Sequence, residues 1–512
     1  MRPRNPDGPD SAEASNEVTP PQADTIRRNT AFALAAQMAG AVFTAALTVF
    51  LVRALGPYEY GLLALAMGIG GVLLIPSDLG ISQSTARFVA ERRQDTPTVA
   101  AMLSVGIGLK AAVAVTVSVA LAAAAGPISA AYGAPGLEWP VRAIALALIG
   151  HSFLTFFAAA FTALGRVALY LRVVLTESAL EVGTGVALVL LGAGATGALL
   201  GRATGYLVAT GLGLFLLARH VGAAAIRPRR GPAREHTRRL LGYAGSLLII
   251  DGAFTLFSKI DVLLIGAILT VRDVGLFEAP ARLVSFLGYA GQALSKGVAP
   301  GLARGRTGTP NIAAFQRAIR LLILVQAFLT VPIVVWAGPI TELILGPGYG
   351  ASAEVLRLLA PFVFLSGISP LLALGLNYHG EARRRIPIAV GAVLINLAID
   401  LTLLPRIGIA AGAIATDVAY IFYTLSHLWI CHRVVGVRLR PLAASLLRSA
   451  LAGAVMAALL VAFGTSDLSI LDLLGGGLIA AVGYGAVLLV TGEVEPSELR
   501  ALLRSVDRRD ST

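Results

Sequence analysis

Long apolar runs separated by short polar stretches cover most of the chain between residues 30 and 490. A helix that crosses the roughly 30 Å apolar core of a bilayer needs about 20 such residues. Runs of this length lie near residues 30–52, 61–83, 98–125, 141–163, 172–192, 196–218, 241–269, 279–302, 318–338, 356–378, 387–404, 409–431, 446–463 and 472–490. The pattern therefore predicts an all-α, polytopic membrane protein with 14 transmembrane helices.

The positions of the basic residues predict the orientation. Lysine and arginine are retained in cytoplasmic loops, and most of the 41 basic residues fall in the two tails and in the loops after even-numbered helices, such as Arg92–Arg93 and Arg383–Arg385. Both termini are therefore expected in the cytoplasm, and the protein in the cytoplasmic (inner) membrane of a bacterium. The net charge of +12 then reflects topology and attraction to membrane lipids, and no nucleic-acid partner is expected.

Composition excludes a soluble protein and argues against an enzyme. The 512 residues are 56% hydrophobic and 14% charged, and the mean hydropathy is +0.79, whereas soluble chains carry about 25% charged residues. None of the lysines lies in a phosphate-binding loop sequence. The longest loops on the predicted outer side, near 126–140 and 338–355, are short and rich in glycine and proline. We therefore expect a chain that is not an enzyme and that binds no cofactor or metal in a catalytic site.

Spaced matches indicate an internal duplication. Gly61 in RALGPYEYGLL corresponds to Gly275 in ILTVRDVGLFE, and Gly197 corresponds to Gly412 at almost the same separation along the chain. Matches in one order at a nearly constant offset indicate a repeated six-helix unit, and an even number of helices makes the two copies parallel. The expected organisation is two pseudo-symmetric lobes with appended parts: a disordered cytosolic tail (1–24), an N-lobe of helices 1–6 (25–220), a basic cytosolic linker (221–240), a C-lobe of helices 7–12 (241–434), two appended C-terminal helices (435–492) and a cytosolic tail (493–512).

Polar residues follow one face of predicted helix eight at spacings of three or four residues. Ionisable groups inside a membrane span face a cavity or a partner. The stripe therefore predicts either the wall of a transport cavity or a face buried within its own lobe with internally paired charges. Its members are Glu278, Arg282, Ser285, Tyr289, Gln292 and Lys296.

Several segments resemble the polysaccharide (O-antigen type) flippases of the multidrug/oligosaccharidyl-lipid/polysaccharide exporter superfamily. The first helix begins after RRNT and ends in RALGPYEYGLL, the second ends in SDLGISQSTARFVAERR, and the eleventh carries NLAIDLTLLPRIG. The order of these segments and the six, six and two helices are similar to that family over essentially the whole membrane portion. The resemblance implies export of an undecaprenyl-diphosphate-linked oligosaccharide by alternating access between two lobes. A lipid II flippase and a drug/cation antiporter of the same superfamily are the alternatives.

The resemblance also implies a cationic cavity, because a diphosphate is an anion that pairs with lysine and arginine. The candidates for the cavity wall are Lys296, Arg282, Lys110, Lys259, Arg202, Gln292, Tyr289 and Ser285. Buried acids that could couple transport to Na⁺ or H⁺ are Asp251, Asp417, Asp400 and Glu181. Asp261 points to another side of its helix than Asp251 and Lys259, and Asn396 and Asp400 lie one turn apart. Membrane lipids and a polysaccharide polymerase or other assembly proteins are expected as partners, and the chain is expected to be a monomer.

Overall fold

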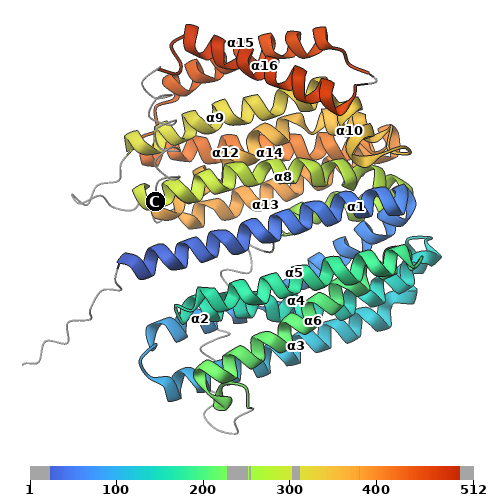
Figure 1. Ribbon diagram of the computed structural model, residues 1–512, viewed down its shortest axis with the longest axis vertical. Coiled ribbons are helices and arrows are strands. Elements are labelled where there is room, and N and C mark those ends of the chain that lie inside the picture. Colours follow the sequence, from blue (N-terminus) through green and yellow to red (C-terminus); the bar gives the residue numbers. More distant parts are fainter. Residues whose placement is uncertain are drawn as a thin grey trace, which may run out of the picture.

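The computed structural model describes residues 23–227, 252, 255–302, 312–379, 381–466 and 468–495, and within these ranges it is helical and without β-strands. Figure 1 shows the long helices running side by side. The first group, which we call the N-lobe, comprises α1 (Ala23–Asp78), α2 (Ile81–Glu91), α3 (Thr96–Ala131), α4 (Glu138–Ala163), α5 (Val167–Leu190) and α6 (Gly194–Val221). The second group, which we call the C-lobe, comprises a helix at 255–268, α8 (Val271–Leu302), α9 (Ile312–Val335), α10 (Ala337–Leu345), α11 (Ser352–Leu358), α12 (Ala360–Tyr378), α13 (Arg385–Ile407) and α14 (Ala410–Ile430). The last two helices are α15 (Leu439–Phe463) and α16 (Ile470–Val490).

Eleven helices in the described ranges are long and apolar enough to cross a membrane. One of them, α1, covers the first predicted span and most of the second, which continues past the end of α1 at Asp78. The predicted span at 241–269 is described only at residue 252 and from residue 255 onward, and the span at 279–302 belongs to α8, which is not among the eleven. The all-helical, multi-pass architecture is thus confirmed, whereas the total of 14 spans and the lobe boundaries stay predictions.

The chain breaks sharply inside α1, at Gly56. Its backbone angles are φ 67° and ψ 175°, a region that glycine enters without steric cost. Pro57 follows and has no N–H to continue the helix. The predicted spans at 30–52 and 61–83 leave a turn at residues 53–60, but the structure confines the interruption to Gly56 and keeps the flanking residues helical. We call this end of the helix bundle the Gly56 end.

The two lobes meet at the glycines that mark the sequence repeat. A Cβ atom on Gly61 would lie 1.9 Å from the carbonyl oxygen of Val271, and one on Gly275 would lie 1.9 Å from the carbonyl oxygen of Pro57. Pro57 and Val271 are separated along the chain by the same interval as the two glycines. The contact is therefore reciprocal, as expected where a pseudo-two-fold axis passes between equivalent segments. It explains why the same short motif is used twice.

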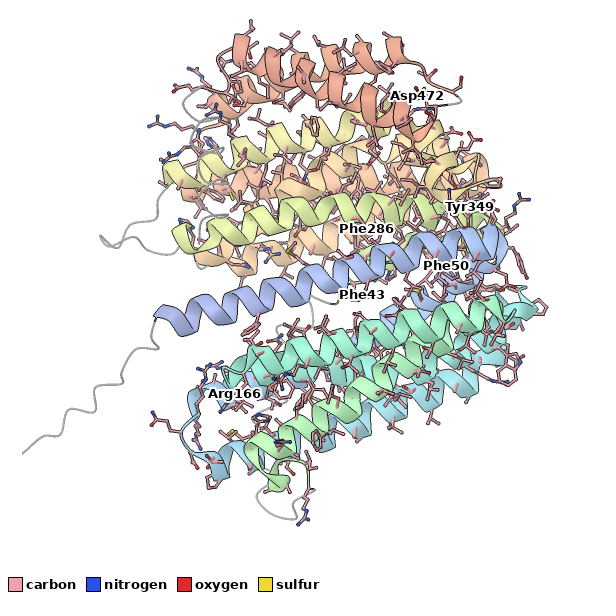
Figure 2. The ribbon with its side chains drawn as sticks, viewed as in Figure 1. Phe43, Phe50, Arg166, Phe286, Tyr349 and Asp472 are labelled. Atoms are coloured by element: carbon pink, nitrogen blue, oxygen red, sulfur yellow. The ribbon has the colours of Figure 1, made fainter. Side chains whose placement is uncertain are left out.

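Side chains join the lobes at the same end. The buried Tyr349 hydroxyl donates to the carbonyl of Val52 at 3.1 Å. The Arg53 guanidinium donates to the carbonyl of Ile344 at 3.0 Å and also to that of Leu343, at the end of α10. Figure 2 shows Tyr349 beside the corresponding end of α1. These bonds and the glycine contact hold the lobes together at the Gly56 end.

Close packing of α5 on α6 positions polar groups inside the N-lobe. Gly197, Gly201 and Gly205 are spaced four residues apart, which predicts a close helix contact. A Cβ on Gly201 would lie 2.3 Å from the Cα of Gly185, and one on Gly205 would lie 2.8 Å from the carbonyl oxygen of Glu177. The contact that the spacing predicts is present, and it brings Arg202 of α6 against the acidic residues of α5.

The last two helices form an outer layer against α9 (Figure 1). The Tyr484 hydroxyl donates to the carbonyl of Leu324 at 2.8 Å, and the Trp336 indole donates to the carbonyl of Gly464 at 2.9 Å. These contacts lie away from the interface between the N- and C-lobes, so α15 and α16 do not line the pockets described below.

Candidate functional site

A pocket at the interface between the lobes and a neighbouring pocket lined by C-lobe residues share one wall of α8. The larger has a volume of 190 Å³ and the smaller 40 Å³, and Glu278 and Arg282 line both. Lys259 and Ser285 line the larger pocket, whereas Arg202 of the N-lobe lines the smaller one. We call the two together the central pocket. It brings together four of the eight predicted cavity residues: Arg202, Lys259, Arg282 and Ser285.

Each arginine of the central pocket is held by a glutamate of its own lobe. Arg202 Nε lies 2.6 Å from Glu181 Oε1, and Arg282 Nε lies 2.7 Å from Glu278 Oε1 on the preceding turn of α8. The side chains of Arg202 and Arg282 are 20% and 27% exposed. Counter-charges are needed because an unpaired buried ion is costly. The glutamates therefore offset the charge of both guanidinium groups and orient them at the interface.

Guanidinium donors are left over after these pairings. An arginine has five N–H donors, and the pairing of Arg282 with Glu278 uses Nε. In the described part of the chain, the η nitrogens of Arg282 make no further hydrogen bond, and Lys259 forms no ion pair. Lys259 crosses the interface to pack on α1, since a Cβ on Gly71 would lie 3.2 Å from Lys259 Cε. The central pocket thus offers cationic donors from both lobes to an anion.

Lys110 does not join the central pocket. Its ammonium group forms an ion pair with Asp78, and its side chain is fully buried. Asp78 ends α1, at a break before α2 where Leu79 and Gly80 both have positive φ. The sequence prediction treats Lys110 as a cation available to the substrate. The structure instead gives it an internal counter-ion, because the helix break turns a carboxylate toward α3.

Part of the predicted stripe and one predicted acid fall outside what the structure describes. The α8 backbone contains Tyr289, Gln292 and Lys296, but their side chains are outside the described part. Asp251 lies outside the described residues altogether. Their roles stay predictions, and the described portion of the stripe ends at Ser285, whose hydroxyl donates to the carbonyl of Arg282 at 2.7 Å.

Two of the predicted coupling acids have partners that give them structural roles. Glu181 pairs with Arg202, as described above. Asp417 Oδ1 accepts a hydrogen bond from the backbone N–H of Phe362 at 2.9 Å. Phe362 lies in the first turn of α12, where N–H groups lack partners within the helix. Asp417 thus caps a helix terminus from a neighbouring helix.

The third predicted acid, Asp400, belongs to a buried polar cluster in the C-lobe. Asp400 and Asn396 of α13 lie beside Asp261 of the helix at 255–268. Thr416 of α14 donates to Asp261 Oδ2 at 2.6 Å. All four side chains are buried. Within the described part of the chain, Asp261 Oδ1, both Asn396 amide atoms and both Asp400 oxygens have no hydrogen-bond partner. We call these four residues the C-lobe acid cluster.

The C-lobe acid cluster fits a small cation or a proton. Two neighbouring buried carboxylates cannot both be charged without a compensating positive charge. Carboxylate, amide and hydroxyl oxygens are the ligands that hard cations prefer, and the unpartnered oxygens are available for this purpose. The predicted coupling acids include Asp400 but not Asp261, since Asp261 points away from Lys259 along its helix. That divergence was the usable signal: Asp261 contacts α14 through Thr416, and both residues line the larger part of the central pocket.

Comparisons with known proteins agree with this architecture. A family model described as "Polysaccharide biosynthesis protein" matches residues 50–354. The "Probable low-salt glycan biosynthesis flippase Agl15" of Haloferax volcanii is 21% identical over 212 residues, which are 40% of this chain and 44% of that protein. The match thus spans less than half of that relative's length.

Solved structures share the fold. "Lipid II flippase MurJ, inward closed conformation" has a TM-score of 0.75 at 13% identity, covering 90% of this chain and 98% of that one. An inward-facing multidrug resistance MATE transporter of the MOP superfamily has a TM-score of 0.62 at 15% identity, covering 78% and 95%. With the family model matching more than half of the sequence, the chain belongs to the polysaccharide biosynthesis protein family and has the fold of MOP-superfamily transporters, as its sequence predicts.

Proposed function

We propose that the protein is a flippase that moves a lipid-diphosphate-linked oligosaccharide across the cytoplasmic membrane by alternating access, for cell-surface polysaccharide synthesis. The observation that carries this proposal is the convergence of Arg202 from one lobe and Arg282 from the other on one interfacial pocket. Lys259 adds a third cation next to Arg282. An anion bound there contacts both lobes, so its binding responds to their relative movement.

The chemistry of the central pocket favours a phosphate-bearing substrate. Arginine forms strong bidentate hydrogen bonds with phosphate oxygens, and a diphosphate presents several oxygens to two arginines at once. In the proposed orientation, with the N-terminus in the cytoplasm, the Gly56 end faces outward. The contacts at that end then close the outer side, and the substrate enters from the inner leaflet.

Two alternatives make different demands on the central pocket. A lipid II flippase also carries a diphosphate lipid, so the pocket is compatible with it. The fold shared with MurJ supports this alternative only at the level of architecture. A drug/cation antiporter binds cationic compounds. The central pocket is lined by three cations, Arg202, Lys259 and Arg282, and by two acids, Glu278 and Asp261. The excess of positive charge favours an anion over a cationic compound. We therefore place lipid-linked oligosaccharide first and lipid II second.

Removal of the Arg282 charge tests the proposed function. In the Arg282→Gln variant we expect binding of a polyprenyl diphosphate to weaken about 10- to 100-fold, because charged hydrogen bonds contribute about 1.5–3 kcal/mol. Binding is measured with purified protein and a fluorescent polyprenyl diphosphate. Arg142→Gln on α4 is the matched control, since Arg142 also pairs with a glutamate four residues earlier, Glu138, but is exposed outside the pocket. Equal affinities for Arg282→Gln and wild type would refute the proposal.

We further propose that the C-lobe acid cluster couples transport to Na⁺ or H⁺. Asp400→Asn removes one of the two neighbouring carboxylates, and with it the repulsion between two negative charges that a bound cation or proton relieves. In proteoliposomes this variant should lose most of the stimulation that an imposed Na⁺ or proton gradient gives to the wild type. Asp417→Asn is the control, because an amide oxygen still accepts the Phe362 N–H bond and coupling should persist. Unchanged gradient dependence in Asp400→Asn would contradict the assignment.

A further inference from the structure

A second interfacial cavity, of 290 Å³, lies toward the opposite end of the bundle from Gly56. Its volume is at the lower end for small-molecule sites, about 300 Å³. It is reached along α1 from the central pocket: Lys259 packs on Gly71, and Asp78 lies seven residues further, or about 10 Å at the helical rise. Residues of α1, α2, α3 and α4 and residues 252 and 255 of the C-lobe line it.

Half of the residues that line this cavity carry neutral groups that can donate and accept hydrogen bonds. They are the hydroxyls of Ser77, Ser82, Ser152, Thr155 and Thr255 and the amide of Gln83. The two charged lining residues, Lys110 and Asp78, form an ion pair with each other. The lining therefore carries no net charge, in contrast to the donors of the central pocket, and a phosphate is not the ligand that it suits.

Asp78 adds a fixed acceptor to the wall. Its Oδ1 accepts hydrogen bonds from both the Lys110 ammonium and the Ser82 hydroxyl, and the bond from Ser82 is 2.5 Å long. Its Oδ2 accepts no hydrogen bond from any residue in the described ranges, and the side chain is 29% exposed. An oriented carboxylate oxygen surrounded by hydroxyl and amide groups complements a ligand with many hydroxyls, because a sugar hydroxyl donates to the carboxylate and also exchanges bonds with the neighbours.

We infer that this cavity binds a neutral sugar residue of the cargo while the diphosphate occupies the central pocket. The inference rests on the proposed function and adds a sugar-binding subsite to it. Asp78 Oδ2, Gln83 and Thr155 are the groups that contact the sugar, and Lys110 is a positioning residue that holds Asp78 in place. A single substrate then spans both sites, with its diphosphate bound in the central pocket and its sugar bound in the second cavity.

The test compares two lipids that differ only in the sugar. The probes are a polyprenyl diphosphate carrying one neutral hexose and the same lipid without a sugar, and affinities are measured with the purified full-length chain. We expect wild type to bind the sugar-bearing lipid about tenfold more tightly, and the Gln83→Ala, Thr155→Val variant to lose that preference while retaining its affinity for the sugar-free lipid. Equal wild-type affinity for both lipids would overturn the inference, as would a preference that survives in the variant.

Two further variants separate this result from others. Thr402→Val on α13 is the matched control for Thr155→Val, because Thr402 and Thr155 both donate to carbonyls of their own helices and Thr402 is exposed and outside the cavity. Its lipid preference should equal that of wild type. Arg282→Gln should weaken the binding of both lipids by the same factor. If Arg282→Gln weakens the binding of neither lipid, the assignment of the diphosphate to the central pocket fails. The ratio of the two lipid affinities still decides whether the sugar subsite exists.

Discussion

Alanine at both Gly61 and Gly275 is expected to open the Gly56 end of the protein. Each new Cβ would lie 1.9 Å from a backbone carbonyl oxygen of the other lobe, and rotation of a side chain cannot relieve a clash with backbone. Overpacking typically costs about 1–3 kcal/mol per site. Because about 1.4 kcal/mol is a tenfold change in an equilibrium constant, the ratio of closed to open protein should fall at least tenfold.

The opening is measured by the reactivity of a cysteine at position 48. Thr48 lines the smaller part of the central pocket, and the only native cysteine, Cys431, is buried and replaced by alanine to remove background. In the Gly61→Ala, Gly275→Ala variant, a membrane-impermeant maleimide added from the side of the Gly56 end should label Thr48→Cys faster than in the parent. Export should fall as well, because a flippase that does not close on that side no longer alternates.

Gly108→Ala is the control for this experiment. Gly108 lies within α3, and a Cβ there meets nothing within 4 Å, so its labelling rate should match that of the parent. Unchanged labelling of position 48 in the double glycine variant would show that the reciprocal contact does not hold the lobes together. Faster labelling in both the double variant and Gly108→Ala would show a general loosening of the helices.

The recurring motif was the most informative feature of the sequence for the fold. Apolar run length predicted where the helices lie, and the nearly constant offset between the matches predicted which segments are equivalent. Neither could predict that Gly61 and Gly275 touch across the interface, since equivalence under a symmetry axis does not say how close to the axis a segment lies. The break at Gly56 was also predicted too broadly, because one glycine followed by proline is sufficient to interrupt the helix.

The polar residues were harder to assign, because the spacing along a helix indicates on which face a side chain lies but not which residue of another helix it contacts. The position of Arg282 on a helix face led to the central pocket. The same reasoning predicts that Lys110 lines a cavity, as it does, but misses the counter-ion Asp78, whose position follows from the helix break at Leu79 and Gly80. It also separated Asp261 from the other candidates, although its different direction is what brings it to Asp400. Partners contributed by other helices require the packing, which spacing along one helix does not contain.

The ion pair between Lys110 and Asp78 gives the second large expected effect, on stability. Asp78→Asn leaves the fully buried Lys110 ammonium without a counter-charge, and breaking a buried pair in this way costs about 3–5 kcal/mol. Lys110→Met should cost less, because the remaining Asp78 side chain is 29% exposed and solvent reaches it. The double variant Lys110→Met, Asp78→Asn should recover most of the loss, since no charge then stays buried.

Thermal unfolding of the purified variants and the yield of monodisperse protein distinguish these outcomes from a role for Lys110 in phosphate binding. A phosphate ligand would make Lys110→Met as stable as wild type but weak in binding a sugar-free polyprenyl diphosphate, and the double variant would bind no better. The ion-pair interpretation requires the reverse. From most to least stable, the order should be wild type, the double variant, Lys110→Met and Asp78→Asn. Every variant that folds should bind the sugar-free lipid as tightly as wild type does. Equal stability of the two single variants would contradict it, because the burial of the two side chains differs.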